Sequence, residues 1–143
     1  MTTDTLILKA YELIKESDIF HDRLELEWAS YLLNLYEKGW LYSAIHRGQI
    51  LAVAGAYRIS KWQEGLRNSI PEREQGKILY VPFLVSHARD NHLPLKFLKH
   101  YLNQNSEVKE IIFFDKYKNI QKKQFKVIRR NKVRLNISAP SLL

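Results

Sequence analysis

Histidine supplies the best candidates for acid-base chemistry in this chain. An imidazole ordinarily titrates at about pH 6.5, so it can accept a proton from an attacking amine near neutral pH. His21 lies at the join between two expected helices, where a loop residue can face a cleft, cap a helix or cover the core. His87, His92 and His100 are spaced by five and then eight residues, and no two of them share a helical face at i, i+4. We therefore expect no metal site.

The acidic side chains and the absence of cysteine further limit the reactions that this chain could catalyse. Glu64, Glu72 and Glu74 lie in the polar stretch 61–76 and could supply a general base through water, although loop acids are more commonly just solvated. The chain has no cysteine, which excludes disulfides, thiolate zinc sites, iron-sulfur clusters and a cysteine nucleophile.

Charge is divided unevenly along the chain, whose net charge is +8. Residues 1–46 hold four Lys/Arg against eight Asp/Glu, whereas residues 47–143 hold nineteen against seven. The segment 116–134 carries nine Lys/Arg and no acid. Such a concentration predicts an acidic partner, which could be a nucleic acid, a phosphorylated cofactor or an acidic carrier protein. A solvated basic face that only aids solubility is the alternative.

Hydrophobic periodicity and turn residues indicate the elements that must position these groups. Helical spacing is expected to begin after a Thr5 cap, and Arg47-Gly48 reads as the two-residue turn of a β-hairpin. Pro82 cannot donate a ladder hydrogen bond, so it predicts a bulge or a place where the neighbouring strand has separated. The expected helices are 5–16, 23–38, 93–103 and a basic helix at 118–130, and the expected strands are 41–46, 49–59, 77–85, 108–115 and 133–137.

Length and composition bound the class of protein. With 143 residues, 45% of them hydrophobic, the chain suits one domain spanning 1–143 with a substantial core. Its apolar runs fall well short of the roughly 20 residues that cross a bilayer, and Met1 to Thr5 lacks the pattern of a signal peptide. We expect a cytoplasmic protein without a membrane span.

The expected element order resembles the fold of the GNAT N-acyltransferases. The order predicts an α/β (α+β) class, in which a mixed sheet is flanked by helices. In that superfamily two central strands splay apart and an acyl thioester enters the gap. By resemblance the splayed pair is 77–85 and 108–115, with Pro82 at the opening. The resemblance also implies that Val81, Phe83 and Val85 bind the thioester donor, with exposed strand amides stabilising an oxyanion.

The coenzyme A loop of the superfamily corresponds here to the stretch from Arg89 to Pro94. Both of its small residues are missing, and Asp90 adds a negative charge where phosphates would lie. Arg89 and Asn91 lie at a helix N-terminus that favours an anion, so they are candidate phosphate contacts, although Asn91 could simply cap the helix. The position of the superfamily's late tyrosine acid holds Phe125.

One branch of the superfamily, the RTX toxin-activating acyltransferases, takes its acyl group from acyl carrier protein and lacks that loop. Three stretches of this chain resemble it: Ser17-Asp18-Ile19-Phe20-His21, Trp40-Leu41-Tyr42-Ser43-Ala44-Ile45 and Ala52-Val53-Ala54-Gly55-Ala56-Tyr57. By this resemblance His21 is the catalytic residue. The family's paired aspartate is replaced, because the matching positions hold Pro82 and Phe83.

Three functions follow as hypotheses. The first is an acyltransferase that moves an acyl group from acyl carrier protein or acyl coenzyme A, without a metal, to an amine on a protein or a small molecule. The second is a catalytically degenerate binding module of the same fold. The third is a nucleic-acid-binding protein that uses the segment 116–134. A homodimer is left open.

Overall fold

The computed structural model describes residues 1–16, 24–61, 69–87, 93–114 and 125–129. Each expected helix and strand outside the C-terminal region is present, with ends shifted by a few residues. In chain order these elements are α1 (Thr3–Glu16), α2 (Glu25–Glu37), β1 (Leu41–His46), β2 (Gln49–Ile59), β3 (Ile78–Ser86), α3 (Leu93–Gln104), β4 (Glu110–Phe114) and β5 (Phe125–Arg129).

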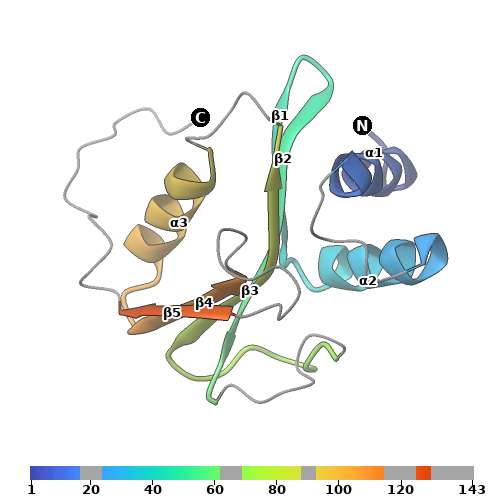
Figure 1. Ribbon diagram of the computed structural model, residues 1–143. Coiled ribbons are helices and arrows are strands. Elements are labelled where there is room, and N and C mark those ends of the chain that lie inside the picture. The colour runs from blue at the N-terminus through green and yellow to red at the C-terminus, as the bar shows by residue number, and fades with distance from the viewer. Residues whose placement is uncertain (17–23, 62–68, 88–92, 115–124, 130–143) are drawn as a thin grey trace.

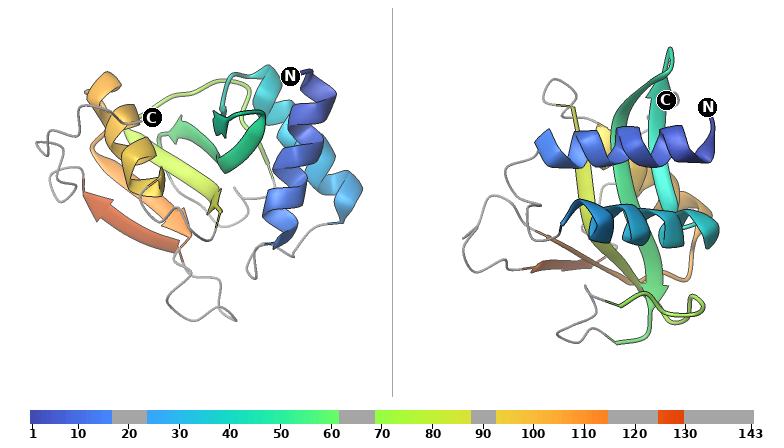
Figure 2. Two further views of the ribbon diagram at one scale, coloured as in Figure 1. Left: turned by 90° about the horizontal axis from the view of Figure 1, so that it is seen from above. Right: turned by 90° about the vertical axis from the view of Figure 1, so that its right-hand side faces the viewer.

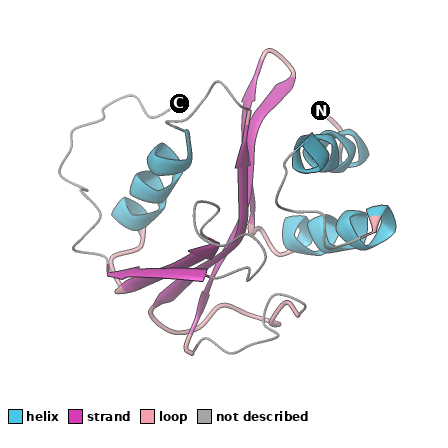
Figure 3. Cartoon of the chain, viewed as in Figure 1, coloured by secondary structure: helices cyan, strands magenta, loops and turns pink. Residues whose placement is uncertain are grey.

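The strands form one mixed sheet in the order β1-β2-β3-β4-β5. Only the pairing of β3 with β4 is parallel, and the other three pairs are antiparallel. Helices α1 and α2 cover one face of the sheet and α3 covers the other, as Figures 1 and 2 show. Figure 3 shows the same three layers by type of element. The expected mixed sheet flanked by helices is confirmed.

The first helix begins one turn earlier than its sequence pattern suggests. The backbone N–H of Thr5 donates to Oγ1 of Thr2 at 3.2 Å, and the N–H of Leu6 donates to the carbonyl of Thr2 at 2.9 Å. Thr2 therefore caps the helix, and the expectation of a Thr5 cap was wrong. Helix α2 begins with part of a capping box, because the Leu24 N–H donates to a Glu27 carboxylate oxygen at 3.3 Å.

The hairpin turn between β1 and β2 is the one that its residues predict. Arg47 and Gly48 have φ values of 50° and 75°, and His46 pairs directly with Gln49. Positive φ at both central residues defines the type I′ turn, whose twist matches that of the flanking strands.

The pairing of β3 with β4 stops halfway along β3. Ile78 to Val81 pair with Glu110 to Phe113, whereas β3 continues to Ser86 with β2 alone beside it. In Figure 1, β4 and β5 turn away from the upper part of β3. The predicted splay of the two central strands is therefore present; we call the space beside the unpaired part of β3 the gap.

Pro82 lies where the splay begins, and it also lies in a β-bulge. Gly55 pairs with Phe83 and Tyr57 with Tyr80, so Val81 and Pro82 together face Ala56 on β2. The extra residue changes the direction of β3 just where its other partner leaves. Of the two readings of Pro82, a bulge and a lost neighbour, the structure shows both.

Two apolar cores lie on the two faces of the sheet. The core under α1 and α2 includes Trp28, Leu35 and Phe83, each no more than 2% exposed. The core under α3 includes Val81, Tyr101 and Ile111, with Leu84 packed against it. Residues of β3 alternate between the two cores on either side of the bulge, and the extra residue shifts the alternation, so that Val81 and Phe83 lie in opposite cores.

The expected basic helix at 118–130 was wrong where the structure describes it. Phe125 to Arg129 form β5, which pairs antiparallel with β4 from Phe114 back to Glu110. This segment contains Phe, Val and Ile, which favour strands, and β4 offers it an open edge. Residues 118–124 and 130, and the expected strand 133–137, lie outside the described residues.

The described helices were also compared with the dimensions of a bilayer. None of them combines the length and the apolar character that crossing a membrane requires.

Gly55 is essential to the packing of β3, and its substitution by alanine should destabilise the fold. An added Cβ would lie 2.8 Å from Cε1 of Phe83 and 2.9 Å from Cδ1 of Leu35, both in the buried core. Overpacking of this kind costs about 1–3 kcal/mol, which exceeds the roughly 0.4–1 kcal/mol gained from a stiffer unfolded chain. We expect Gly55→Ala to lower the free energy of unfolding by about 1–2 kcal/mol in urea denaturation.

The double variant Gly55→Ala/Phe83→Leu is the matched control, because it removes the clashing ring edge. Its loss of stability should be smaller than the sum of the two single losses. Strict additivity of the two losses would show that the ring of Phe83 does not depend on the space above Gly55.

Candidate functional site

The gap presents backbone amides of β3 that no strand in the described part of the chain uses. The N–H of His87 donates to the carbonyl of Leu51 at 2.7 Å. Hydrogen-bonded pairs alternate along an antiparallel ladder, so the amides of Phe83 and Val85 also point to β2. Those of Leu84 and Ser86 point the opposite way, into the gap.

The pairing of β2 with β1 supports the same assignment. The N–H of Ala56 donates to the carbonyl of Trp40 at 3.1 Å. In this part of β2, the backbone N–H and C=O groups of even-numbered residues therefore point to β1, and those of odd-numbered residues point to β3. Gly55 and Val53 are the odd-numbered partners of Phe83 and Val85. Leu84 and Ser86 are each partly exposed.

Three residues expected to bind the donor, Val81, Phe83 and Val85, lie on β3 with their side chains in the two cores. Val81 belongs to the core under α3, and the other two belong to the core under α1 and α2. The backbone of Val81 is the last of β3 to pair with β4. The binding role of these residues stays a prediction, and the amides placed to carry it are those of Leu84 and Ser86.

Large aromatic side chains of β3 pack away from the gap. The ring of Phe83 lies 5.5 Å from that of Trp28, edge to face, and against Gly55 of β2. The ring of Tyr80 lies 5.6 Å from that of Tyr57 on β2. Both rings thus lie in the core under α1 and α2.

Several candidate residues lie outside the described part of the chain. These are the candidate base His21 and the candidate phosphate contacts Arg89 and Asn91. Among the described residues, no group of three or more His, Asp or Glu is arranged to hold a metal ion.

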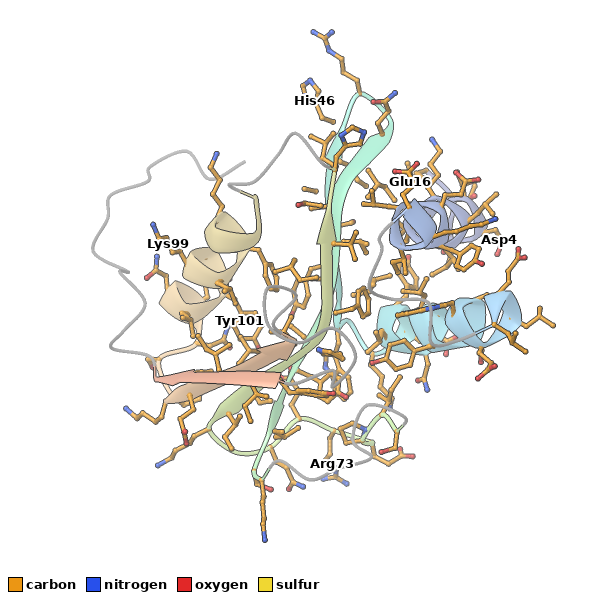
Figure 4. The ribbon with its side chains drawn as sticks, viewed as in Figure 1. Asp4, Glu16, His46, Arg73, Lys99 and Tyr101 are labelled. Atoms are coloured by element: carbon orange, nitrogen blue, oxygen red, sulfur yellow. The ribbon has the colours of Figure 1, made fainter. Side chains whose placement is uncertain are left out.

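A second concave feature lies between the start of β1 and the C-terminal half of α3; we call it the tyrosine hollow. It has a volume of about 310 Å³, and its lining includes Trp40, Tyr42, Glu74, Phe97 and Tyr101. The Tyr101 hydroxyl donates a long hydrogen bond of 3.5 Å to Oε1 of Glu74. Figure 4 shows Tyr101 between α3 and the sheet.

Burial and a nearby carboxylate suppress ionisation of the two tyrosines. Burial, reinforced by the charge of Glu74, raises the pKa of Tyr101 well above its ordinary value. The same two causes, in the same order, raise the pKa of Tyr42. Both hydroxyls therefore stay protonated and act as hydrogen-bonding groups rather than as bases.

Glu74 is held in place by Arg58 on β2. Nε of Arg58 lies 3.6 Å from Oε2 of Glu74, and the other end of the guanidinium pairs closely with Glu107. The side chains of Arg58 and Glu74 are about one quarter exposed, so water screens this pair only in part.

Sequence reasoning found the elements of the tyrosine hollow but not the hollow itself. Glu74 is one of three loop acids that the sequence offers as a base, and Tyr101 falls within the expected helix 93–103. Tyr42 and Arg58 carried no local signal, because the hollow forms only when β1, the segment before β3, and α3 meet.

Solved structures resemble this chain, two of which follow, whereas no protein-family model and no curated protein matches its sequence. One is described as the GphF GNAT-like decarboxylase in complex with isobutyryl-CoA, with a TM-score of 0.55 and 18% identity over 78% of this chain. The other is the loading GNATL domain of CurA from Lyngbya majuscula, with a TM-score of 0.54 and 14% identity over 78% of this chain. This chain spans 60% and 59% of their respective lengths. With its splayed central strands and these likenesses, the chain has the fold of the GNAT superfamily.

Proposed function

We propose that this protein binds an acyl thioester in the gap between β3 and β4 and transfers the acyl group to an amine. The observation that carries the proposal is the end of β3–β4 pairing at Val81, beyond which β2 is the one partner of β3 among the described strands. Leu84 and Ser86 then offer strand N–H groups to a ligand. A narrow thioester chain lying along β3 can use these groups much as a missing strand would.

The similar structures support an acyl thioester as the ligand class. GphF is described in complex with isobutyryl-CoA, and the CurA domain is described as a loading domain. Both likenesses are of fold, at identities of 18% and 14%. The amides facing the gap in this chain are the independent support.

The donor is proposed to be acyl carrier protein or acyl coenzyme A. Arg89 and Asn91 precede α3, and a helix N-terminus favours a phosphate group, which both donors carry. The stretch between Arg89 and Pro94 lacks the superfamily's two small residues, and the larger side chains there hinder close approach of a pyrophosphate. This favours acyl carrier protein as the donor. The basic segment 116–134 would suit the acidic surface of such a carrier.

The reaction needs three groups placed together. The amine nitrogen attacks the thioester carbonyl, and the N–H groups facing the gap stabilise the oxyanion of the tetrahedral intermediate. His21 accepts a proton from the attacking amine and returns it to the departing sulfur. A carbon–nitrogen bond forms, the carbon–sulfur bond breaks, and an amide and a free thiol leave.

A binding module that has lost catalysis is the competing function. The absent aspartate, with Pro82 and Phe83 at its positions, favours this alternative. Such a module would bind the same acyl thioester but would not transfer the acyl group. Binding and transfer therefore have to be measured separately.

Thioester binding should be measured first, with acetyl coenzyme A, acyl carrier protein loaded with a fatty acyl group, and a short RNA as separate ligands. A ligand present at a hundred times its Kd stabilises the native state by about 2.7 kcal/mol, which corresponds to a rise in Tm of about 5–10 °C for a chain of this size. We expect this rise with a thioester donor and an unchanged Tm with RNA. A rise with RNA alone would instead favour the nucleic-acid hypothesis.

Two proline variants locate the binding site. Leu84→Pro removes an N–H that faces the gap, so the ladder with β2 should survive while binding weakens at least tenfold. Val85→Pro removes an N–H that serves β2 and should lower Tm without any ligand. In the wild-type protein, the amide resonances of Leu84 and Ser86 should shift on adding the donor. If these two resonances stay fixed while the donor binds, the gap is not the site.

Catalysis is tested by His21→Ala, with His46→Ala as its matched control. His46 is exposed near the hairpin turn, as Figure 4 shows, away from β4. We expect His21→Ala to retain donor binding and to lose at least a hundredfold in transfer to an amine, followed by mass spectrometry, because general-base catalysis contributes about 10²–10⁴. Equal rates for both variants would remove His21 from the mechanism, and binding without transfer in the wild type would favour the binding module.

A further inference from the structure

The tyrosine hollow has the lining of a binding site and no part in the proposed transfer. Its volume of about 310 Å³ suits a small molecule. It lies beside β1 and the C-terminal half of α3, whereas the gap lies two strands away, between β3 and β4. The chemistry of its lining can therefore be considered on its own.

Aromatic rings from two elements gather on one side of the hollow. The ring of Tyr42 on β1 lies 5.1 Å from that of Phe97 and 5.9 Å from that of Tyr101, both on α3. Trp40, just before β1, also lines the hollow. The faces of such rings carry negative electrostatic potential and attract cations, most strongly where water is partly excluded.

A carboxylate adds negative charge to the same hollow. Glu74 lines it and interacts with Arg58, which is shared with Glu107. Lys38 also lines the hollow, so these four charges sum to zero and Glu74 acts as a local anionic group. Burial, and after it the charge of Glu74, raises the pKa of Tyr42 and Tyr101. The carboxylate of Glu74 is thus placed to balance the charge of a cation that lies against the rings.

At the rim of the hollow, a cationic side chain already contacts one of the lining rings. The ammonium group of Lys38 lies 5.4 Å from the centre of the Trp40 ring, within the range of a cation–π contact, and also donates to the backbone carbonyl of Glu72 at 3.2 Å. The tether of Lys38 to Glu72 holds its ammonium group at the rim.

We propose that the tyrosine hollow binds a small organic ammonium ion. The rings of Tyr42, Phe97 and Tyr101 would contact the carbon atoms next to the nitrogen, and the carboxylate of Glu74 would balance the charge. The hollow is thus a second ligand site, separate from the thioester gap and independent of whether transfer occurs.

The wild-type protein tests the proposal with charged probes and their neutral analogues. Choline is compared with 3,3-dimethylbutan-1-ol, and propylammonium with propan-1-ol, by calorimetric titration and by the side-chain resonances of Phe97 and Tyr101. We expect at least one cation to bind ten times more tightly than its neutral analogue and to shift these resonances. Preference for choline or for propylammonium identifies a quaternary or a primary ammonium ligand. Equal affinity within both pairs would overturn the proposal.

Variants then assign the contributions of charge and ring. Glu74→Gln should weaken cation binding about tenfold and leave binding of the neutral analogue unchanged. Glu72→Gln, an exposed acid on the same segment, is the matched control and should bind as the wild type does. Phe97→Leu keeps an apolar side chain but removes the ring, and should also weaken the cation selectively. A Glu74→Gln protein that is folded and binds the cation normally would contradict the charge assignment.

The two sites are tested independently. Thioester binding should be the same in Glu74→Gln and the wild type, because the carboxylate lies beside β2 and α3 rather than in the gap. Leu84→Pro should likewise keep its affinity for the ammonium probe. Failure of the ammonium probes would leave the proposed transfer intact, and failure of the thioester donors would leave the ammonium site intact.

Discussion

The fold depends on β3 remaining paired with β2 after β4 has left it. A strand with one neighbour has lost half of its ladder, and here the loss is offset on the other side. The ring of Phe83 fits into the space that Gly55 leaves open on β2, against Trp28 and beneath α2. Burying a phenylalanine side chain contributes about 1.5–3 kcal/mol, comparable to a few ladder hydrogen bonds. The same contact keeps the bulge at Pro82 in register with β2.

This arrangement makes the gap a polar site on an apolar scaffold. An unpaired backbone N–H costs free energy if it is buried, so it must reach water or a ligand. Leu84 and Ser86 are only partly exposed, and the ladder on their other side fixes the direction of their amides. Donors fixed in advance lose little entropy when they meet a carbonyl oxygen, which is why such strands suit acyl chemistry.

Local signals in the sequence were sufficient for most of the fold. Arg47-Gly48 predicts its turn because glycine adopts positive φ without steric cost, and Pro82 predicts a break because it lacks an N–H. The segment 125–129 was misread as helix because its partner, the open edge of β4, is distant in the sequence. Which amides of β3 face the gap could not be predicted either. Their direction follows from the register with β2, which a sequence pattern does not contain.

The two sites favour ligands of opposite charge. Unpaired N–H groups in the gap favour a partial negative charge, such as a carbonyl oxygen, whereas Glu74 and the rings of the hollow favour a positive one. Helix α3 lies between them: Phe97 and Tyr101 line the hollow, and the core that includes Tyr101 also holds Val81 and packs against Leu84. Occupancy of one site changes affinity at the other only if it alters how α3 packs on β3, because their charges act on different ligands. If α3 stays rigid, the two sites therefore bind their ligands independently. If α3 shifts on binding, each ligand changes the affinity for the other by the same factor.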